Sequence, residues 1–316
     1  MPCDVGLRNL ILDAFTESWD QTVDVAIVGY GFAGAAAAIE AHDLGAAVVL
    51  IEKNATPGGI SICSAGGVRI ARDRDAALAY LIETNAGTTP EAPLAALAEG
   101  MTEVAGFIES IAKAAGANAV TNWMPGTYAF EGYETFGFIS IADYPGLDLN
   151  EAYPHVRGLR GGTRLFAAVE HNVKARGIEV QVSTAAERLI TESDGSVVGV
   201  AVRDASGLRR IRARGGVILA CGGFEADAAM QAQYWQGKPA LPQAYSGNTG
   251  DGIRMAQAVG ADLWHMWHYH GTYGMSHPDP DYPYGMRLTK FPDWIPGHGE
   301  PDDVPAFFSV SQGKRM

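Results

Sequence analysis

The chain has 316 residues, of which 47% are hydrophobic and 19% charged, so it can bury a large core and is not intrinsically disordered. Its 36 acidic and 23 basic residues give a formal net charge of -13. A general nucleic-acid-binding protein needs a basic face that replaces counterions, so we predict no nucleic-acid partner.

The cysteines and the N-terminal sequence favour a reducing compartment. Cys3, Cys63 and Cys221 are far apart and form neither a CxxC pair nor a metal-ligand spacing. Residues 1–20 lack the basic and apolar regions of a secretory signal, and we expect a short helix within them at Leu7–Phe15. No apolar run approaches the roughly 20 residues that a membrane span requires. We therefore expect a cytoplasmic protein with no membrane span.

The chain then predicts a βαβ unit. Val23–Gly29 is an apolar run rich in β-branched residues, which is typical of a buried strand. Ala33–Leu44 is rich in alanine and predicts a helix that ends near Gly45. Ala47–Glu52 predicts a second buried strand.

The turn between the first strand and the helix reads Gly29-Tyr30-Gly31-Phe32-Ala33-Gly34 and fits the pattern G-x-G-x-x-G. In such turns the first glycine allows a tight bend, the second lets the backbone approach a pyrophosphate, and the third lets helix and strand pack closely. Glu52 ends the second strand 18 residues past Gly34, where a carboxylate can accept a hydrogen bond from a ribose hydroxyl. The pattern predicts a dinucleotide site. An ordinary strand–helix turn would leave the position of Glu52 unexplained.

Two more glycine pairs follow closely, Gly58-Gly59 and Gly66-Gly67, and the residues between them include Ser61 and Ser64. Bulky side chains are avoided across this stretch, which indicates that it lies close to a flat, extended ligand. An NAD-dependent dehydrogenase would explain the first glycine cluster and Glu52, but it would leave Gly58–Gly67 without a purpose.

The next segments are mostly helical, and then the hydrophobic period changes to two. Helices are predicted at Arg74–Asn85, Pro93–Ala114 and Thr163–Arg176. Short strands are predicted within 178–184, 186–195, 196–207 and 208–223, and two of the connections carry the turn pairs Asp194-Gly195 and Ser206-Gly207.

The wholly apolar run Gly216–Ala220 is expected to return to the central sheet, and Asp251–Gly260 predicts one more helix. From about Trp264 aromatic residues, prolines and histidines crowd together and long periodic segments end. We therefore predict two domains, at 1–264 and 265–316.

Three motifs in this order resemble one flavoprotein family. Gly58–Gly67 matches the form G-G-x-(S/T)-x-x-(S/A)-x-G-G, which in soluble fumarate reductases and 3-ketosteroid dehydrogenases passes along the ribityl chain and isoalloxazine of FAD. Val217–Asp227 (VILACGGFEAD) resembles the returning strand of that family, with cysteine in place of threonine. Ser246–Leu263 resembles its T-G-D-G-I helix segment.

The resemblance implies an α/β fold: a glutathione-reductase-like Rossmann FAD-binding domain with inserted antiparallel β-strands, followed by the start of an α+β catalytic (cap) domain. It implies FAD as cofactor, contacted by Gly29, Gly31, Phe32, Ala33, Gly34, Glu52, Lys53, Gly58, Gly59, Ser61, Ser64, Gly66, Gly67, Ala186, Ala220, Gly222, Gly223 and Asp251. Members that attach FAD covalently carry a histidine six residues before the last glycine pair, where this chain has Ile60. Non-covalent FAD is therefore expected.

The catalytic residues implied by the resemblance are few. Arg315 matches an arginine of the proton path in fumarate reductases, His270 lies near the substrate-binding polar residues of those enzymes, and Tyr144 resembles a loop tyrosine of ketosteroid dehydrogenases. The family's remaining catalytic residues normally come later, so we expect an N-terminal portion or a natural truncation. The histidines at 265, 268, 270 and 277 would also suit a metal, but no carboxylate or cysteine stands at ligand spacing, and we predict no metal site.

The expected reaction is hydride transfer at a CH–CH bond beside a carbonyl group, by desaturation or by reduction. The C-terminal segment offers few cations, Arg287, Lys290, Lys314 and Arg315, among many aromatic residues, which favours a bulky apolar ketone, steroid-like, or an enoate as substrate. A fumarate or urocanate type of reductase and a non-catalytic FAD-binding fragment are the alternatives. The electron partner is not indicated.

Overall fold

The computed structural model describes residues 18–156, 161–237, 240–242, 244–267, 274–275, 278–279, 281, 285–288 and 308–310. The chain divides into two compact units, one formed by Met1–Ile60 with Glu179–Met316 and the other by Ser61–Ile178. The predicted helix at Leu7–Phe15 lies outside the described residues. The predicted domain boundary after residue 264 remains a prediction.

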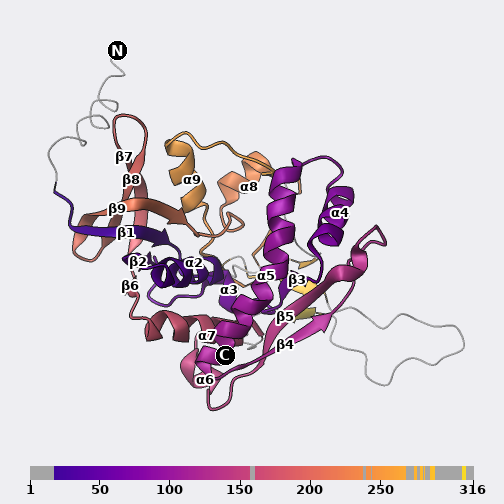
Figure 1. Cartoon of the computed structure of the whole chain (residues 1–316). Helices are drawn as coiled ribbons and strands as arrows, with labels where there is room; N and C mark the ends of the chain where they lie inside the picture. The colour runs from indigo at the N-terminus through magenta and orange to yellow at the C-terminus, as the bar shows by residue number, and fades with distance from the viewer. Residues whose placement is uncertain are drawn as a thin grey trace, which may run out of the picture. The chain divides into compact units, whose positions relative to one another are not determined.

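A six-stranded sheet forms the centre of the first unit (Figure 1). Its strands, in spatial order, are β6 (Glu179–Gln181), β2 (Val48–Ile51), β1 (Gln21–Val28), β9 (Gly207–Leu219), β8 (Val197–Asp204) and β7 (Ala185–Thr191). β6, β2, β1 and β9 run parallel, whereas β8 and β7 pair antiparallel to their neighbours. The predicted parallel sheet with an antiparallel insertion is therefore confirmed.

The returning strand does what its apolar sequence predicts. The second half of β9 pairs in parallel with β1, Val25 with Gly216 through Val28 with Leu219, whereas its first half pairs with β8. One long strand thus joins the antiparallel insertion to the central sheet. β6 is shorter than the predicted segment 178–184, and Ser183, just beyond it, has a positive φ of 49°.

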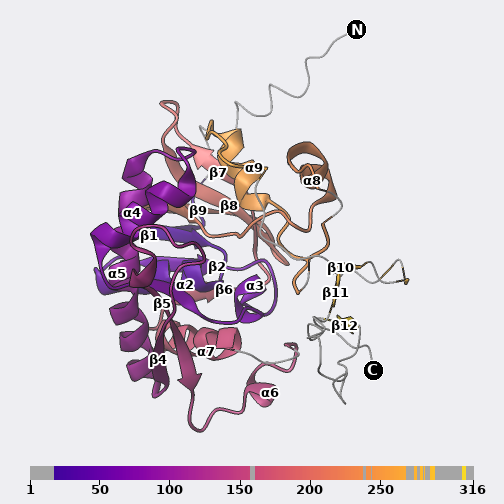
Figure 2. The same ribbon diagram turned by 90° about the vertical axis from the view of Figure 1, so that its right-hand side faces the viewer.

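Helices α2 and α9 pack on this sheet through small or apolar residues. α2 (Phe32–Asp43) packs on β1 and β2 through its buried residues, among them Ala35, Ala38 and Ile39. α9 (Asp251–Ala258) lies against β7 (Figure 2), and its Met255 joins the core of the sheet. A helix that was not predicted, α8 (Ala228–Tyr234), is anchored by a cluster of Phe224, Met230 and Trp235.

The second unit packs helices against a three-stranded antiparallel sheet (Figure 1). The sheet has the order β3 (Val68–Ala71), β5 (Phe136–Asp143), β4 (Asn118–Trp123). The helical segments are α4 (Arg74–Asn85), α5 (Glu91–Ala115), the 3-10 turn η2 (Tyr133–Thr135), α6 (Leu149–Ala152) and α7 (Gly161–Ala175). The long helix α5 contacts all three strands as well as α4 and α7.

The three longer helices of this unit, α4, α5 and α7, were predicted, whereas α6, η2 and the sheet were not. The bounds of α4 agree with the prediction, because Asp73 caps the helix by accepting a hydrogen bond from Ala76 N at 2.7 Å. The short helix α3 (Gly59–Ile62) spans the boundary between the units, and a small sheet β10–β11–β12 (Gly274–Met275, Met286–Leu288, Phe308–Val310) completes the described elements. Among the described residues no helix is long and apolar enough to cross a membrane.

Candidate functional site

The turn after β1 requires glycine at two of its positions for contacts within the protein. Gly29 has a φ of +105°, and a Cβ added there would lie 2.3 Å from the carbonyl oxygen of Ala220 on the neighbouring strand. A Cβ on Gly34 would lie 1.8 Å from the carbonyl oxygen of Gly29. The glycines therefore pack the helix and both strands against the turn, as the motif predicts.

The start of α2 is suited to an anion. Gly31 is its N-cap residue, no side chain caps the helix, and the first turn contains no acidic residue. The N–H groups of a helix start and its positive dipole then favour a negatively charged ligand. A dinucleotide pyrophosphate fits this position.

Glu52 links the end of β2 to the glycine turn. Its side chain is buried, with 6% exposure, and it accepts hydrogen bonds from Tyr30 N at 3.0 Å and from Asn54 N at 2.9 Å. The chain then continues alongside 183–184, since Thr184 N donates to Glu52 O and Ser183 N to Asn54 O. This places the segment that leads into Ala186 beside the end of β2. Glu52 thus holds the loop in addition to being the expected ribose ligand.

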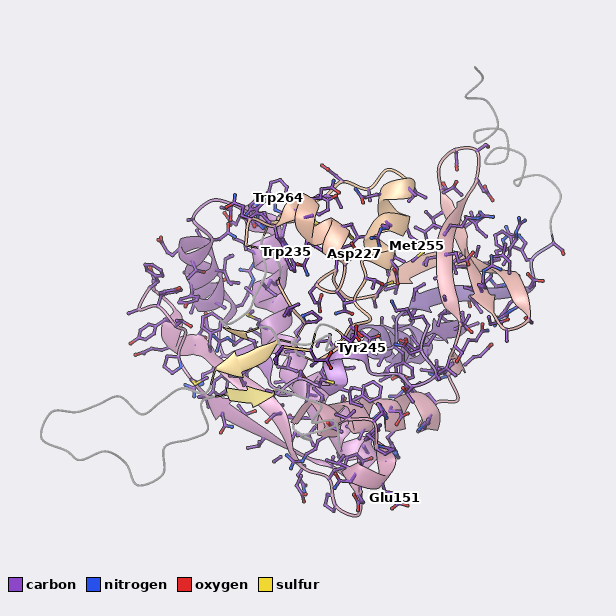
Figure 3. All side chains as sticks on the ribbon, turned by 180° about the vertical axis from the view of Figure 1, so that it is seen from behind. Glu151, Asp227, Trp235, Tyr245, Met255 and Trp264 are labelled. Carbon is purple, nitrogen blue, oxygen red and sulfur yellow. The ribbon has the colours of Figure 1, made fainter. Side chains whose placement is uncertain are left out.

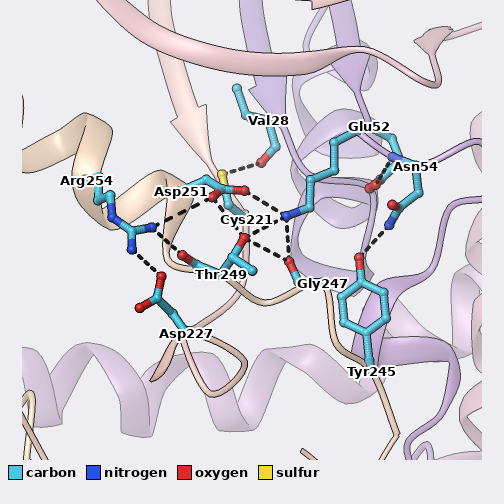
Figure 4. Close-up of polar contacts among 11 residues, drawn as sticks. Val28, Glu52, Asn54, Cys221, Asp227, Tyr245, Gly247, Thr249, Asp251 and Arg254 are labelled. Carbon is cyan, nitrogen blue, oxygen red and sulfur yellow. Dashed lines mark hydrogen bonds and ion pairs between the residues drawn. The ribbon is translucent and has the colours of Figure 1, made fainter. Parts of the chain in front are cut away.

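Lys53 connects the end of β2 to the start of α9, and Figure 4 labels its three acceptors, Asp251, Thr249 and Gly247. Its Nζ atom donates to Asp251 Oδ2 at 2.7 Å, Thr249 Oγ1 at 3.1 Å and Gly247 O at 2.5 Å. Burial alone would raise the pKa of Asp251, but hydrogen bonds from Lys53 and Thr249 outweigh burial and hold the pKa below its ordinary value. Lys53 and Asp251, two predicted cofactor residues, are therefore one ion pair.

The predicted residues after β9 meet the same loop. A Cβ on Gly222 would lie 2.6 Å from Asn248 Oδ1, and Gly250 N donates to Gly223 O at 3.0 Å. Asn248 is buried and its Nδ2 donates to Glu225 Oε1 at 2.6 Å. Backbone and amide contacts therefore fix Ala220–Gly223 against the segment that precedes Asp251.

Asp227 and Arg254 strengthen this loop from outside. Asp227, the N-cap of α8, forms an ion pair with Arg254 on α9, and Arg254 also donates to the carbonyl oxygen of Thr249. Asp227 and Trp235 mark the two ends of α8 in Figure 3. Sequence reasoning did not identify this ion pair.

Gly58 and Gly59 carry positive φ angles of 113° and 48°, and Gly58 N donates to Tyr30 O at 2.8 Å. The ring of Tyr245 lies over this pair, 3.6 Å from the position of a Cβ on Gly59. Tyr245 Oη accepts a hydrogen bond from Asn54 Nδ2 at 2.5 Å (Figure 4). Tyr245 and Asn54 were missed by the sequence reasoning, because their contact joins positions 191 residues apart.

Gly66 is needed for contacts inside the second unit. It has a φ of +73°, and a Cβ there would lie 2.1 Å from the carbonyl carbon of Gly161 at the start of α7. Ser64 accepts at two atoms, from Gly66 N at its Oγ and from Gly162 N at its backbone oxygen, both at 3.1 Å. Ser61 accepts from Ser64 N at its backbone oxygen, also at 3.1 Å. The glycine pair Gly161-Gly162, which sequence reasoning passed over, is the partner of Gly66 in this close approach of two backbones.

Gly67 differs from its neighbour. It is exposed, and the nearest atom to an added Cβ is Phe138 Cδ1 at 3.4 Å, an ordinary contact. Among the described residues of the second unit no contact demands glycine at position 67, and its predicted contact with FAD remains a prediction.

Of the three predicted catalytic residues, Tyr144 alone lies among the described residues. Tyr144 follows β5 in a turn and is half-buried; burial first, and then the Glu170 carboxylate, raise its pKa. His270 and Arg315 lie outside the described residues. The structure therefore brings predicted cofactor residues of the first unit together around the ends of β1, β2 and β9, and both the cofactor contacts and the catalytic assignment remain predictions.

A turn at the ends of parallel strands, with an uncapped helix start and a carboxylate on the next strand, defines a dinucleotide-binding protein of the Rossmann class. The family described as FAD binding domain matches residues 24–274, and this chain belongs to it. Its cofactor is accordingly FAD.

Named relatives come from two groups. An NADH:fumarate oxidoreductase from Klebsiella pneumoniae is 28% identical over 254 residues, which cover 76% of this chain and 25% of that protein. A 3-oxosteroid 1-dehydrogenase from Mycolicibacterium smegmatis is 28% identical over 311 residues, covering 77% of this chain and 54% of that protein.

A solved structure, the 3-ketosteroid delta1-dehydrogenase from Sterolibacterium denitrificans in complex with 1,4-androstadiene-3,17-dione, superposes with a TM-score of 0.72 at 25% identity. The superposition covers 85% of this chain and 60% of the Sterolibacterium denitrificans chain. The chain thus spans between a quarter and somewhat more than half of the length of the curated relatives described above.

Proposed function

We propose that this chain is an FAD-dependent oxidoreductase that acts on a CH–CH bond adjacent to a carbonyl group. The observation that carries the proposal is the meeting of the Gly29–Gly34 turn, Glu52 and the Asp251 loop at the ends of β1, β2 and β9. This arrangement fits a dinucleotide, and the two groups of relatives support the reaction class. When bound, FAD supplies the acceptor or donor of hydride.

Each part of the site has a role in holding FAD. The N–H groups around Gly31 bind the pyrophosphate, and the Glu52 carboxylate accepts from the ribose. The loop that Lys53 ties to Asp251 keeps Ala220–Gly223 in place beside them. Ile60 stands where a histidine would be needed for a covalent link, so the cofactor is dissociable.

The substrate is a carbonyl compound whose oxygen gains negative charge during the reaction, and it requires a hydrogen-bond donor. Tyr144 supplies that donor. A phenol is protonated near neutral pH, and burial foremost, followed by the Glu170 carboxylate, raises the pKa of Tyr144 further, which favours donation of a hydrogen bond or a proton. An apolar ketone of the steroid kind is the leading substrate class, and the Klebsiella relative makes an unsaturated carboxylate of the fumarate type the alternative.

Flavin content tests the cofactor half of the proposal. The purified chain should be yellow, and acid or heat denaturation should release all of the flavin into the supernatant. Glu52→Ala should lower the flavin content severalfold, because it removes the ribose ligand and two hydrogen bonds of the loop. Glu187→Ala is the matched control, since its carboxylate forms an ion pair with Arg203 at the surface of the same unit. Colourless protein, or flavin that stays with the precipitate, would contradict the proposal.

Anaerobic bleaching of the flavin tests the reaction. A 3-keto steroid should be tested as the electron donor that bleaches oxidised flavin, and fumarate as the electron acceptor that restores the colour of chemically reduced flavin. The compound that changes the flavin spectrum identifies the substrate class. Tyr144→Phe should slow bleaching by roughly 10²–10⁴-fold. Tyr128→Phe, a change of the same type at a 60% exposed position, should leave the rate unchanged. Equal rates for Tyr144→Phe and the wild type would remove Tyr144 from the reaction.

A further inference from the structure

The strand β4 lies at the edge of the second unit's sheet, and its outer side has no strand partner among the described residues (Figure 1). Met124 N donates to Phe136 O, the residue directly across the pair, so every second residue back from Met124 turns its N–H and C=O groups towards β5. The backbone groups of Ala119, Thr121 and Trp123 therefore point outward. An edge of this kind can hydrogen-bond a further strand.

The central part of β4 lacks the features by which exposed edges usually avoid such pairing. A register shift lies at the first residue of the strand, between Asn118 and Ala119, and Pro125 comes after its last residue. Residues 114–130 contain no Asp, Glu, Lys, Arg or His. Natural edge strands are more often guarded by a charge, above all by lysine. Residues 119–123 are thus open to pairing.

Exposed apolar side chains lie on this strand and in the loop that follows it. Between 38% and 60% of the surface is exposed in each of Val120, Trp123, Met124, Tyr128 and Phe130. Large side chains that are about half exposed offer roughly 100 Å² each, so the five offer on the order of 500 Å². A stable interface buries about 800 Å² per partner, and a paired strand backbone adds to the side-chain area. The surface is therefore large enough to form the centre of a protein–protein contact.

The ring of Trp123 is held in place before any partner binds. A Cβ on Gly137 would lie 2.7 Å from Trp123 Cε3, so the glycine makes room for the indole on β5. The guanidinium carbon of Arg72 lies 3.9 Å from the centre of the same ring. A fixed side chain loses little conformational entropy when a partner covers it, and tryptophan is a frequent hot spot of interfaces.

The charge of the chain indicates which partner fits this surface. The chain has 36 acidic and 23 basic residues, so two copies repel one another through their net charge of -13. The uncharged segment 114–130 lets two copies meet without placing like charges in contact. A partner attracted by charge would need a basic surface and would dock on acidic residues, which this segment lacks. A second copy of the chain is therefore the occupant that the segment suits.

We propose that two copies of this chain form a dimer by antiparallel pairing of their β4 strands about a two-fold axis at Thr121. In this register Thr121 faces its own counterpart and Ala119 faces Trp123, so the outward-pointing N–H and C=O groups are paired. Paired threonines are favourable neighbours across strands, and the small side chain of Ala119 leaves space beside the indole. The dimer is an interaction beyond the proposed function and does not depend on it.

Sedimentation velocity of the flavin-containing full chain tests the proposal. The wild type should sediment as a dimer at on the order of 100 μM. Val120→Lys should be monomeric, because the two copies of residue 120 are diagonal neighbours in this register and their ammonium groups would repel. Asn122→Lys adds the same charge at an exposed polar position and should act likewise. Trp123→Ala should raise the dissociation constant of the dimer by on the order of 30-fold.

Leu97→Lys is the matched control. Leu97 is 48% exposed on α5 of the same unit and lies outside the uncharged segment, so its replacement should leave the dimer unchanged. Hydrogen exchange read by mass spectrometry locates the contact. The peptide 117–124 should exchange more slowly at high than at low concentration of the wild type, and at one rate in Val120→Lys.

The opposite results would overturn the inference. Wild type that stays monomeric at on the order of 100 μM has no such dimer. A dimer that persists in both lysine variants, or that leaves the exchange of peptide 117–124 unchanged, uses another surface. Assembly beyond two copies would also contradict the proposal, because two-fold pairing occupies both free edges. Flavin content is measured on the same samples, so protein without flavin would count against the proposed function alone.

Discussion

Replacement of Gly66 by alanine tests whether that glycine serves the protein's own backbone. The new Cβ would lie 2.1 Å from the carbonyl carbon of Gly161 and 2.3 Å from Gly162 N, so one of the two backbone segments must move. The residue also has a φ of +73°, which disfavours any residue with a Cβ by roughly 1–2 kcal/mol. Overpacking adds roughly 1–3 kcal/mol, so the total loss should be roughly 2–5 kcal/mol.

Gly87→Ala separates these two costs. Gly87 has nearly the same φ, +76°, in the same unit, but an added Cβ would meet nothing within 4 Å. This variant should therefore lose only the backbone part, about 1–2 kcal/mol. The difference between the two variants isolates the contact with Gly161.

The assay is the urea dependence of unfolding followed by far-ultraviolet circular dichroism, with the free energy of unfolding compared among wild type, Gly66→Ala and Gly87→Ala. Equal losses in the two variants would refute the reasoning, because backbone overlap would then cost nothing. A Gly66→Ala protein of full stability that has lost its flavin would show instead that position 66 serves the ligand alone.

Three further predictions concern the first unit. Because the folded-state pKa of Asp251 is lowered, its ionised form stabilises the fold at pH above about 3.8, and this contribution is lost as pH falls through the folded-state pKa. Asp251→Asn should therefore flatten the acid side of a plot of urea midpoint against pH. A plot that runs parallel to that of the wild type would contradict this prediction. Burial foremost raises the pKa of Cys221 to about 11. Iodoacetamide at pH 8 should therefore alkylate this thiol about a hundredfold more slowly in the folded than in the denatured chain, as measured by peptide mass spectrometry. Equal alkylation rates would contradict the prediction. Tyr245→Phe removes the hydrogen bond from Asn54 but keeps the ring over Gly59. The free energy of unfolding should fall by about 1 kcal/mol, and the flavin content should be retained. Loss of flavin would instead show that the Tyr245 hydroxyl contacts the cofactor.

The central sheet could be predicted from the sequence because its signals are local. β2 and the second half of β9 are continuous apolar runs, β1 ends in one at Val25–Val28, and glycine turns follow β1 and β9. The sheet of the second unit was missed for two different reasons. β5 does alternate, with Ile139 and Ile141 buried and Ser140 partly exposed, so a signal was present. β4 is exposed to solvent along most of its length, so its sequence carries no clear alternation, and its pairing with β5 identifies it as a strand.

The site was predictable to the same degree. The positions of Gly29, Gly31 and Glu52 follow from a motif in which each residue has its own physical task. The ion pair of Lys53 with Asp251 and the bond of Asn54 to Tyr245 join positions 198 and 191 residues apart, and only the folded sheet brings them together. A motif lists the residues at one end of such a contact and says nothing of the other.

The glycines of Gly58–Gly67 show that the glycines of one motif can be required for different physical reasons. The sequence treats all four as bare backbone for a flat ligand. The structure divides them, because Gly66 already has a backbone against it whereas the space beside Gly67 is bounded only by Phe138 at ordinary distance. A glycine with a protein reason carries no information about a ligand, so the case for ligand contact in the second unit rests on Gly67.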